Sequence, residues 1–588
     1  MNSALLPSCP ESAVSSGLLG RIGRLWVAAG LAQALVVSAQ TSPAVPTPAV
    51  VPQLGGVLQL APTAPTPILP ERPAPPQEMA KPQDDVRIPI ARFELAGDAP
   101  ASLRLALPAL TQRFTGNDRG FEDMAGAAAE VTRWLQRELG WYLGYAYVPA
   151  QEPEVTEQGN VVKLALLEGR LDQVVLNWDD TIAVKREVVE AYLARLVPGE
   201  ILHVREIERT VFLINDLRGL TAQFEVRAGK TTGTAELVVT AKPEDRWSVK
   251  MGSDLNGSRY MGQVRVDALG QWNSPFGIGD GLTGNFLSST TGGLRFGLLG
   301  YTAPVGADGV KLNTSLSAVR YALDKVQFPL ELQGSAMTFN ASVLYPWVRS
   351  RNLNVFVIAS AESKRFEDSN LISSTRKHIE TVTVASTGDF RDSVLGGGVN
   401  TYDVSLNSGH VNYPDGRPSS LLDAPSFTKV IGGATRLQDI VSGHLLAYAT
   451  WRGQWSTKNL DTTEQFRVGG PDGVRGFAPG EGTGDAGWVS SLELRWLPPQ
   501  AWFGSTAREL VASAFYDAGH VRYRNQPAPG STTPTSDTFT AAGLGLAWVR
   551  PNAWSLRFTL AKPLEGTPRS DVRVRDPRLY AQANFFFH

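Results

Sequence analysis

The pattern that decides the fold is clearest near the C-terminus, in the stretch Trp554-Ser555-Leu556-Arg557-Phe558-Thr559-Leu560. Large apolar residues alternate with polar ones, and successive residues of a β-strand point to opposite faces. In a soluble sandwich the apolar face would be the core. In a membrane barrel it would face lipid, and the polar face would line the lumen. One such strand leaves both interpretations open.

The same alternation recurs on either side of this stretch, in residues 445–454 and again in 579–587. After roughly Asp245 the chain contains about 16 such segments of about ten residues, separated by Gly, Asn, Asp and Pro. An even number of strands suits a closed barrel whose two ends lie on one side of the membrane. The C-terminal Phe585-Phe586-Phe587-His588 resembles the signal that outer-membrane barrels present to their assembly machinery, which we therefore expect as a partner. These patterns predict an antiparallel transmembrane β-barrel over 246–588.

Before the barrel, strand and helix patterns combine twice in the order strand, helix, helix, strand, strand. The first round, 88–168, predicts strands at 86–96, 145–148 and 161–167 and helices at 103–114 and 121–139. The second round, 169–245, predicts strands at 171–178, 222–228 and 235–241 and helices at 185–196 and 204–215. Each round has the size of one small domain.

The N-terminus has the features of a secretory signal peptide over 1–39. Arg21 and Arg24 precede an apolar run at 25–37, and small residues, Val37-Ser38-Ala39, form a cleavage site. The apolar run is short for a transmembrane anchor. The only cysteine, Cys9, lies in this leader, so the mature chain would have no disulfide or thiolate site. Residues 40–87 are rich in proline and predict an extended linker.

Composition and motifs exclude several classes of function. The formal net charge of −2 gives no support to nucleic-acid binding. The sequence contains no GxSxG, HExxH, Walker or CxxC motif, and its six histidines show no ligand spacing. We therefore expect no catalytic residue, no metal site and no cofactor.

Two segments carry motifs that point to one protein family, which the alternation of apolar and polar residues cannot do. The first reads Gln465-Phe466-Arg467-Val468-Gly469-Gly470-Pro471-Asp472-Gly473-Val474-Arg475-Gly476-Phe477, and the second reads Phe515-Tyr516-Asp517-Ala518-Gly519. Together they resemble the VRGF loop tip and the FxDxG strand of the Omp85 superfamily. More narrowly, they resemble the two-partner-secretion transporters of the outer membrane, the TpsB proteins of ShlB/FhaC type. Within 169–245, Pro198-Gly199-Glu200-Ile201-Leu202 and Leu213-Ile214-Asn215-Asp216-Leu217 are similar to the second POTRA domain of that family.

The resemblance implies that residues 458–487, between the eleventh and twelfth strands, fold back into the lumen. Gly469, Gly470 and Gly473 would permit the tight reversal, because residues with a Cβ resist it. The tip would consist of Val474, Arg475, Gly476 and Phe477, and the lumen wall beside it of Phe515, Asp517 and Gly519. A guanidinium held away from bulk water needs a partner, and Asp517 is the candidate because arginine–carboxylate pairs can be bidentate.

The function implied by the resemblance is export of one cognate exoprotein, an adhesin or haemolysin, without nucleotide hydrolysis. The POTRA domains 1 and 2, at 88–168 and 169–245, would bind this partner in the periplasm. The family often has a plug helix after the signal peptide. Here the proline-rich sequence departs from the family, and 55–61 spans only about two helical turns, so linker and partial plug both stay open. A barrel-assembly factor, a passive porin and a β-sandwich surface protein are the rival interpretations.

Overall fold

The structure is a computed structural model. It describes residues 79–83, 86–152, 154–157, 159–231, 233–326, 331–418, 421–531, 534–569 and 577–587. The expected signal peptide, the 55–61 segment, most of the proline-rich segment and His588 lie outside these ranges. Those expectations therefore stay predictions.

The first α/β domain packs its helices against a mixed sheet of strand order β2-β1-β5-β3, with β4 paired to β5. Its elements are β1 (Ile88–Ala96), α2 (Ala101–Thr111), η1 (Gln112–Phe114), β2 (Gly116–Arg119), α3 (Phe121–Glu138), β3 (Tyr145–Tyr147), β4 (Glu154–Thr156) and β5 (Gly159–Leu167). The apolar stripe of α3, including Val131 and Leu135, is fully buried against the sheet. The short strands β2 and β4 are additions to the expected order, because short polar segments carry no alternation that would reveal them.

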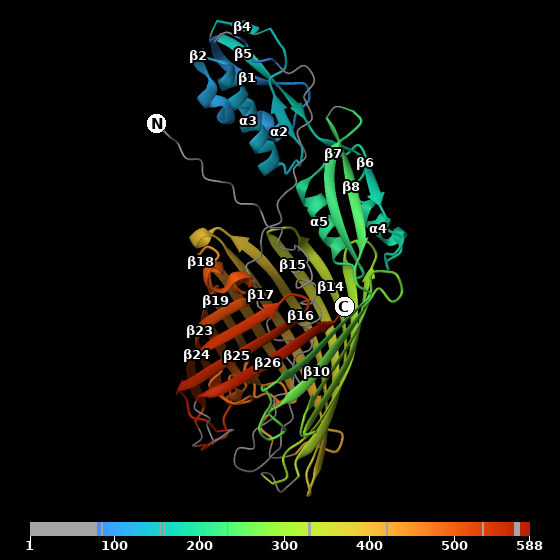
Figure 1. The fold of residues 1–588 in the computed structure, drawn as a ribbon, viewed down its shortest axis with the longest axis vertical. Helices are drawn as coiled ribbons and strands as arrows, with labels where there is room; N and C mark the ends of the chain where they lie inside the picture. The colour runs from blue at the N-terminus through green and yellow to red at the C-terminus, as the bar shows by residue number, and fades with distance from the viewer. Residues whose placement is uncertain are drawn as a thin grey trace.

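The second α/β domain has a three-stranded sheet of order β6-β8-β7. Its elements are β6 (Arg170–Asn177), α4 (Arg186–Leu193), α5 (Val204–Asn215), β7 (Leu220–Ala228) and β8 (Thr234–Pro243). β6 runs parallel to β8, whereas β7 is antiparallel to it and forms one edge of the sheet. The core includes Val189, Ile214 and Leu237. Figure 1 shows this domain, in green, between the first domain and the barrel.

Sixteen antiparallel strands of the described residues close into a barrel. They are β9 (Trp247–Asp254), β10 (Arg265–Asn273), β11 (Gly281–Ser289), β12 (Leu294–Val305), β13 (Val310–Ala322), β14 (Gln333–Arg349), β15 (Leu353–Ser369), β16 (Ser374–Asp392), β17 (Gly398–Asn412), β18 (Ser426–Val441), β19 (Leu445–Ser456), β22 (Ala486–Trp496), β23 (Leu510–Arg522), β24 (Ser536–Arg550), β25 (Trp554–Glu565) and β26 (Arg578–Phe587). Closure joins β26 to β9, with Gln582 opposite Asp254 and Phe587 opposite Val249. Short helical turns η2 (Val394–Gly396), α6 (Gln500–Phe503) and η3 (Gly504–Glu509) lie in connections.

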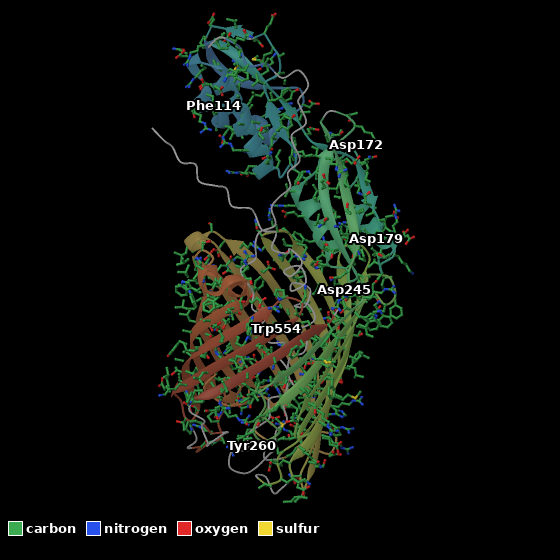
Figure 2. All side chains as sticks on the ribbon, in the orientation of Figure 1. Phe114, Asp172, Asp179, Asp245, Tyr260 and Trp554 are labelled. Carbon is green, nitrogen blue, oxygen red and sulfur yellow. The ribbon has the colours of Figure 1, made fainter. Side chains whose placement is uncertain are left out.

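The two faces of the barrel strands decide between barrel and sandwich. On β25, Phe558 and Leu560 are exposed on the outside of the barrel, whereas Thr559 between them is buried. β26 repeats this arrangement, with Leu579 exposed and Tyr580 buried. An apolar exterior around a polar interior is the arrangement of a membrane barrel. In Figure 2, Asp245 marks where the second α/β domain meets the barrel, and Tyr260 lies toward the far end.

The expectation of uniform ten-residue strands is wrong for the middle of the barrel. β14 and β15 each have 17 residues and β16 has 19. Alternation continues past the length needed to cross a bilayer, so the pattern did not reveal where the membrane ends. No helix among the described residues has the length and apolar character to cross a bilayer.

Candidate functional site: the inward loop and the lumen wall

The candidate site lies on the long connection between the eleventh and twelfth strands, β19 and β22, as the motif implied. β19 ends at Ser456 and β22 begins at Ala486, so the loop is placed within two residues of the expected 458–487. Two short strands within it, β20 (Phe466–Arg467) and β21 (Thr483–Gly484), pair with each other and not with the barrel wall. The side chains of Val468, Val474 and Phe477 are almost completely buried, so the loop is packed inside the barrel.

The guanidinium of Arg475, at the loop tip, forms a bidentate pair with the carboxylate of Asp517 on β23. Its Nε donates to one carboxylate oxygen over 2.8 Å and its Nη2 to the other over 2.7 Å. Its backbone N–H also donates to Asp517, over 3.1 Å. Asp517 is completely buried, so this carboxylate depends on the loop for its charge partner. A bidentate pair of this kind fixes orientation as well as position.

Three further residues complete the environment of the Arg475 guanidinium. Glu493 accepts a hydrogen bond from Nη1 over 3.1 Å, and Ser491 accepts one from Nη2 over 2.9 Å. The guanidinium carbon lies 3.2 Å from the ring centroid of Phe515, a cation–π contact. Phe515 was expected here, but Glu493 and Ser491 were not. The sequence could have indicated both residues. Positions 491 and 493 of β22 point into the lumen by the alternation of the strand, and Ser491 is the register partner of Asp517.

The rest of the tip packs into a buried apolar cluster. Phe477 packs edge-on against Phe539, with ring centroids 5.0 Å apart. Its carbonyl oxygen accepts a hydrogen bond of 2.9 Å from the Tyr580 hydroxyl of β26. Val474 belongs to the same cluster and is fully buried. The tip is therefore held by packing on the β24 and β26 side as well as by charge on the β22 and β23 side.

The glycines of the motif act mainly by allowing close approach. Among the expected loop glycines only Gly470 has a positive φ, +126°. A Cβ at Gly476 would lie 2.8 Å from the backbone nitrogen of Pro563, and one at Gly473 would collide with the Val468 carbonyl. On the wall, a Cβ at Gly519 would lie 2.5 Å from Val468 Cγ1. The expectation of a tight reversal therefore explains Gly470. The others, including Gly469 beside Glu481, are required by contact.

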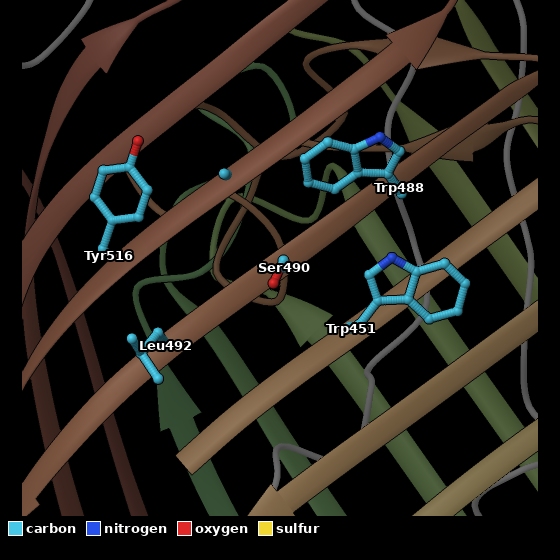
Figure 3. A pocket seen from close by; sticks show the side chains of 6 residues that line it. Trp451, Trp488, Ser490, Leu492 and Tyr516 are labelled. Atoms are coloured by element: carbon cyan, nitrogen blue, oxygen red, sulfur yellow. The ribbon is translucent and has the colours of Figure 1, made fainter. Parts of the chain in front are cut away.

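A shallow hollow of about 480 Å³ lies on the lipid-facing side of the same strands. Its lining residues are Trp451, Trp488, Ser490, Leu492, Tyr516 and Ala518. Figure 3 shows these side chains standing on neighbouring strands. Those on β22 and β23 alternate with the residues that hold Arg475, so the hollow is on the opposite face of the wall from the tip.

A second group of contacts joins the second α/β domain to the barrel. Arg349 at the end of β14 donates to both carboxylate oxygens of Asp216, over 3.0 and 2.8 Å, and lies over the Phe212 ring. Lys311 donates to the Asp216 carbonyl over 2.9 Å, and Arg209 to the Pro346 carbonyl over 2.8 Å. Asp216 lies in a segment that suggested the POTRA resemblance, but its barrel partner could not be read from sequence.

Each side of this junction contributes both signs of charge, since Asp216 and Arg195 of the domain pair with Arg349 and Asp308 of the barrel. Burial raises the pKa of Tyr192 on α4 to about 12, and the nearby carboxylates of Asp216 and Asp308 add to the shift. The Tyr192 hydroxyl therefore stays neutral at physiological pH. Arg349 and Lys311 of the barrel supply positive charge beside Asp216.

The described ranges contain no group of three or more His, Cys, Asp or Glu side chains arranged to hold a metal ion. The chemistry of the site is thus that of a buried salt-bridge network inside a barrel, with a loop as one partner.

Comparison with known proteins assigns this arrangement to a family. Over 468 residues the chain is 23% identical to the haem/hemopexin transporter protein HuxB of Haemophilus influenzae, covering 78% of this chain and 80% of that protein. It is 24% identical over 431 residues to the hemolysin transporter protein ShlB of Serratia marcescens, covering 71% and 73%.

The solved structure of CdiB from Escherichia coli superposes with a TM-score of 0.67 at 18% identity, covering 88% of this chain and 94% of that one. The fold is thus a transmembrane barrel preceded by two α/β POTRA domains. The model of the family "Haemolysin secretion/activation protein ShlB/FhaC/HecB" matches residues 233–547, and the relatives are transporters. The chain therefore belongs to the ShlB/FhaC/HecB family, as an outer-membrane transporter that exports a cognate exoprotein by two-partner secretion.

Proposed function

We propose that the protein binds the unfolded N-terminal region of an adhesin-like or haemolysin-like exoprotein and passes it, extended, through the lumen. The observation that carries this proposal is the tip of the inward loop, held in the lumen by Arg475 and Asp517. A passive pore has no need of a loop fixed by a bidentate buried pair. A transporter that must stay closed at rest and open for one partner has such a need.

Cargo recognition is assigned to the two POTRA units, 88–168 and 169–245. β7 supports this assignment, because among the described strands it pairs only with β8 and leaves its other edge open. An exposed strand edge can accept an extended peptide by strand addition, with main-chain hydrogen bonds for affinity and side-chain pockets for specificity. An unfolded exoprotein segment fits this mode of binding.

The junction between the second domain and the barrel supports delivery of the cargo to the lumen. Arg349, Lys311 and Arg209 hold α5 and the residues after it against turns at the barrel end. A segment bound along β7 would therefore be kept near the entrance. We assign the energy of export to folding of the cargo outside the cell, since a folded product cannot re-enter a narrow lumen. In this proposal the protein performs no catalysis and hydrolyses no nucleotide.

Secreted proteins should be compared between a strain with the chain, a strain without it, and a strain carrying Arg475→Ala. We expect one large exoprotein to disappear from the medium without the chain and to be strongly reduced with Arg475→Ala. Arg365→Ala, at an exposed arginine of β15, is the matched control and should leave export unchanged.

Deletion of 88–241 tests the POTRA assignment in the same assay. Loss of the exoprotein is expected, with the barrel still in the membrane. Retained export would contradict cargo recognition by these units. A general loss of outer-membrane barrels, in place of one secreted protein, would favour a barrel-assembly factor.

A further inference from the structure

The first limb of the inward loop, residues 457–464, has contacts of its own, with other partners than those of the Arg475 tip. Leu460 is completely buried and belongs to an apolar cluster that includes Phe366, Ile379 and Phe427, from β15, β16 and β18. The amide of Asn459 donates to the carbonyls of Leu422 and Gln526 over 3.0 and 2.8 Å. The limb is therefore packed between the long strands of the barrel and neighbouring loops.

Three buried lysines on that wall hold the acidic residues of the limb. Lys377 of β16 donates to both carboxylate oxygens of Asp461, over 2.8 and 2.9 Å. Lys364 of β15 and Lys429 of β18 each lie 2.9 Å from the carboxylate of Glu464. We call Lys364, Lys377 and Lys429 with Asp461 and Glu464 the lysine clamp. Its side chains are 7% exposed or less.

Each ammonium group of the clamp is paired with a carboxylate. Lys364 also pairs with Glu362 of its own strand over 2.8 Å, and the carboxylates of Asp368 and Asp423 lie near Lys377. Burial of charge is tolerated only when each group is paired and hydrogen-bonded, and removal of one partner leaves the other uncompensated. Loss of one member of the clamp would therefore weaken the hold of the wall on the limb.

The clamp is at the end of the barrel away from the α/β domains. The turn between β14 and β15 contacts the second α/β domain, where Glu208 accepts from the Arg351 N–H. Lys364 lies toward the opposite end of β15, Lys377 near the start of β16 and Lys429 near the start of β18. In the outer membrane this end opens to the cell surface. The tip contacts different strands, β22 and β23.

We propose that the lysine clamp is a second, separate anchor, whose lysines position the first limb across the cell-surface end of the lumen and keep that end closed at rest. This deepens the proposed function, because it makes the limb the segment that must leave before cargo emerges. Lysine suits the task, since an ammonium on a flexible stem is strongly hydrated when released. Opening then replaces each ion pair by two solvated ions.

Accessibility of the limb tests the proposal in the full-length protein in cells. Cys9 is the only native cysteine and lies in the expected leader, so Leu460→Cys introduces a unique thiol into the barrel. A membrane-impermeant maleimide should label this thiol slowly in the otherwise native chain. Addition of Lys377→Met should raise the labelling rate about tenfold or more, because Asp461 then draws the limb into water. Lys377→Arg should restore slow labelling, because a guanidinium can bind the same carboxylate.

Two controls make the result specific. Lys562→Met changes an exposed lysine of β25 and should leave labelling slow. Arg475→Ala releases the tip. If the two anchors are separate, the thiol of Leu460→Cys should still be labelled slowly in this variant. Rapid labelling of the parent, an unchanged rate with Lys377→Met, or an equal rise with Arg475→Ala would each overturn the proposal.

Heat-modifiable migration on gels shows that each variant is a folded barrel. If Lys377→Met does not insert, Lys429→Met takes its place with the same expectation. Single-channel recordings of the purified protein provide a second measurement, in which clamp variants should open more often and Lys377→Arg should not. Neither the labelling nor the recording needs cargo. A negative result in them would therefore contradict the lysine clamp alone, and a negative secretion result would contradict the proposed function alone.

Discussion

The lumen face and the lipid face of β22 and β23 differ although they are built on one backbone. Inward, Ser491 and Asp517 surround a single guanidinium and are joined by a hydrogen bond of 2.7 Å. Outward, Leu492 and Tyr516 are exposed and line a shallow hollow. Each outward residue is the chain neighbour of an inward one. The inner face is specified residue by residue, whereas the outer face needs only to be apolar.

The difference follows from the two surroundings of the wall. Lipid offers no hydrogen bonds, so a lipid-facing position tolerates any apolar side chain of suitable size. The lumen wall beside the loop carries largely buried charge, so each polar group there needs a particular partner. Substitutions on the lumen face should therefore impair export, whereas those on the lipid face should lower the stability of the barrel.

The largest effect is expected from Asp517→Ala on the inner face. It leaves Arg475 buried without its main carboxylate, at a cost of about 3–5 kcal/mol to the docked loop. Export should fall below about a tenth of the native amount while the barrel stays folded, as secretion assays and gel mobility would show. Asp517→Asn keeps an acceptor and should be less severe. Native export by Asp517→Ala would remove the tip from the mechanism.

Leu492→Arg on the outer face should act on stability and not on the site. A charge near the middle of a lipid-facing strand costs about 2–4 kcal/mol. Urea unfolding in lipid vesicles, followed by tryptophan fluorescence, should show that loss in the free energy of unfolding. Protein that is inserted should still export cargo. A selective export defect with native stability would contradict the separation of the two faces.

Ser491→Ala returns to the inner face with a smaller change. It removes the hydroxyl between Arg475 and Asp517 but leaves the bidentate pair, so the loss should be about 1 kcal/mol. Export should fall only a few fold. A double-mutant cycle with Asp517→Asn should give a coupling energy, because the two residues share a hydrogen bond.

The smallest effect is expected from Tyr516→Phe in the lipid-facing hollow. The ring remains and only a hydroxyl is removed, so the change in unfolding free energy should stay within about 0.5 kcal/mol. Export should be native. If this variant exported poorly, the hollow would have a specific role that its apolar lining does not explain.

Much of the molecule could be predicted because it depends on local pattern or on a compact motif. Alternation indicated the barrel strands, though not the length of the longest ones, and the paired motifs pointed to Arg475, Asp517 and Phe515. Glu493 was missed, although the alternation of β22 places it on the lumen side. Lys364, Lys377 and Lys429 were missed because a lysine in an alternating strand looks like any lumen residue. Their partners are far along the chain, as Lys364 is 100 residues from Glu464.

The sequence by itself predicted the barrel strands and their two faces, because a period of two acts through local geometry, and the paired motifs implied an inward loop through their resemblance to a family. Beyond the Arg475–Asp517 pair, only the tertiary structure decided what the loop touches. Closing the barrel brings β15, β16 and β18 around the first limb and β22 and β23 around the tip. A charge chooses its partner by distance in space, and that distance is fixed only once the wall has closed.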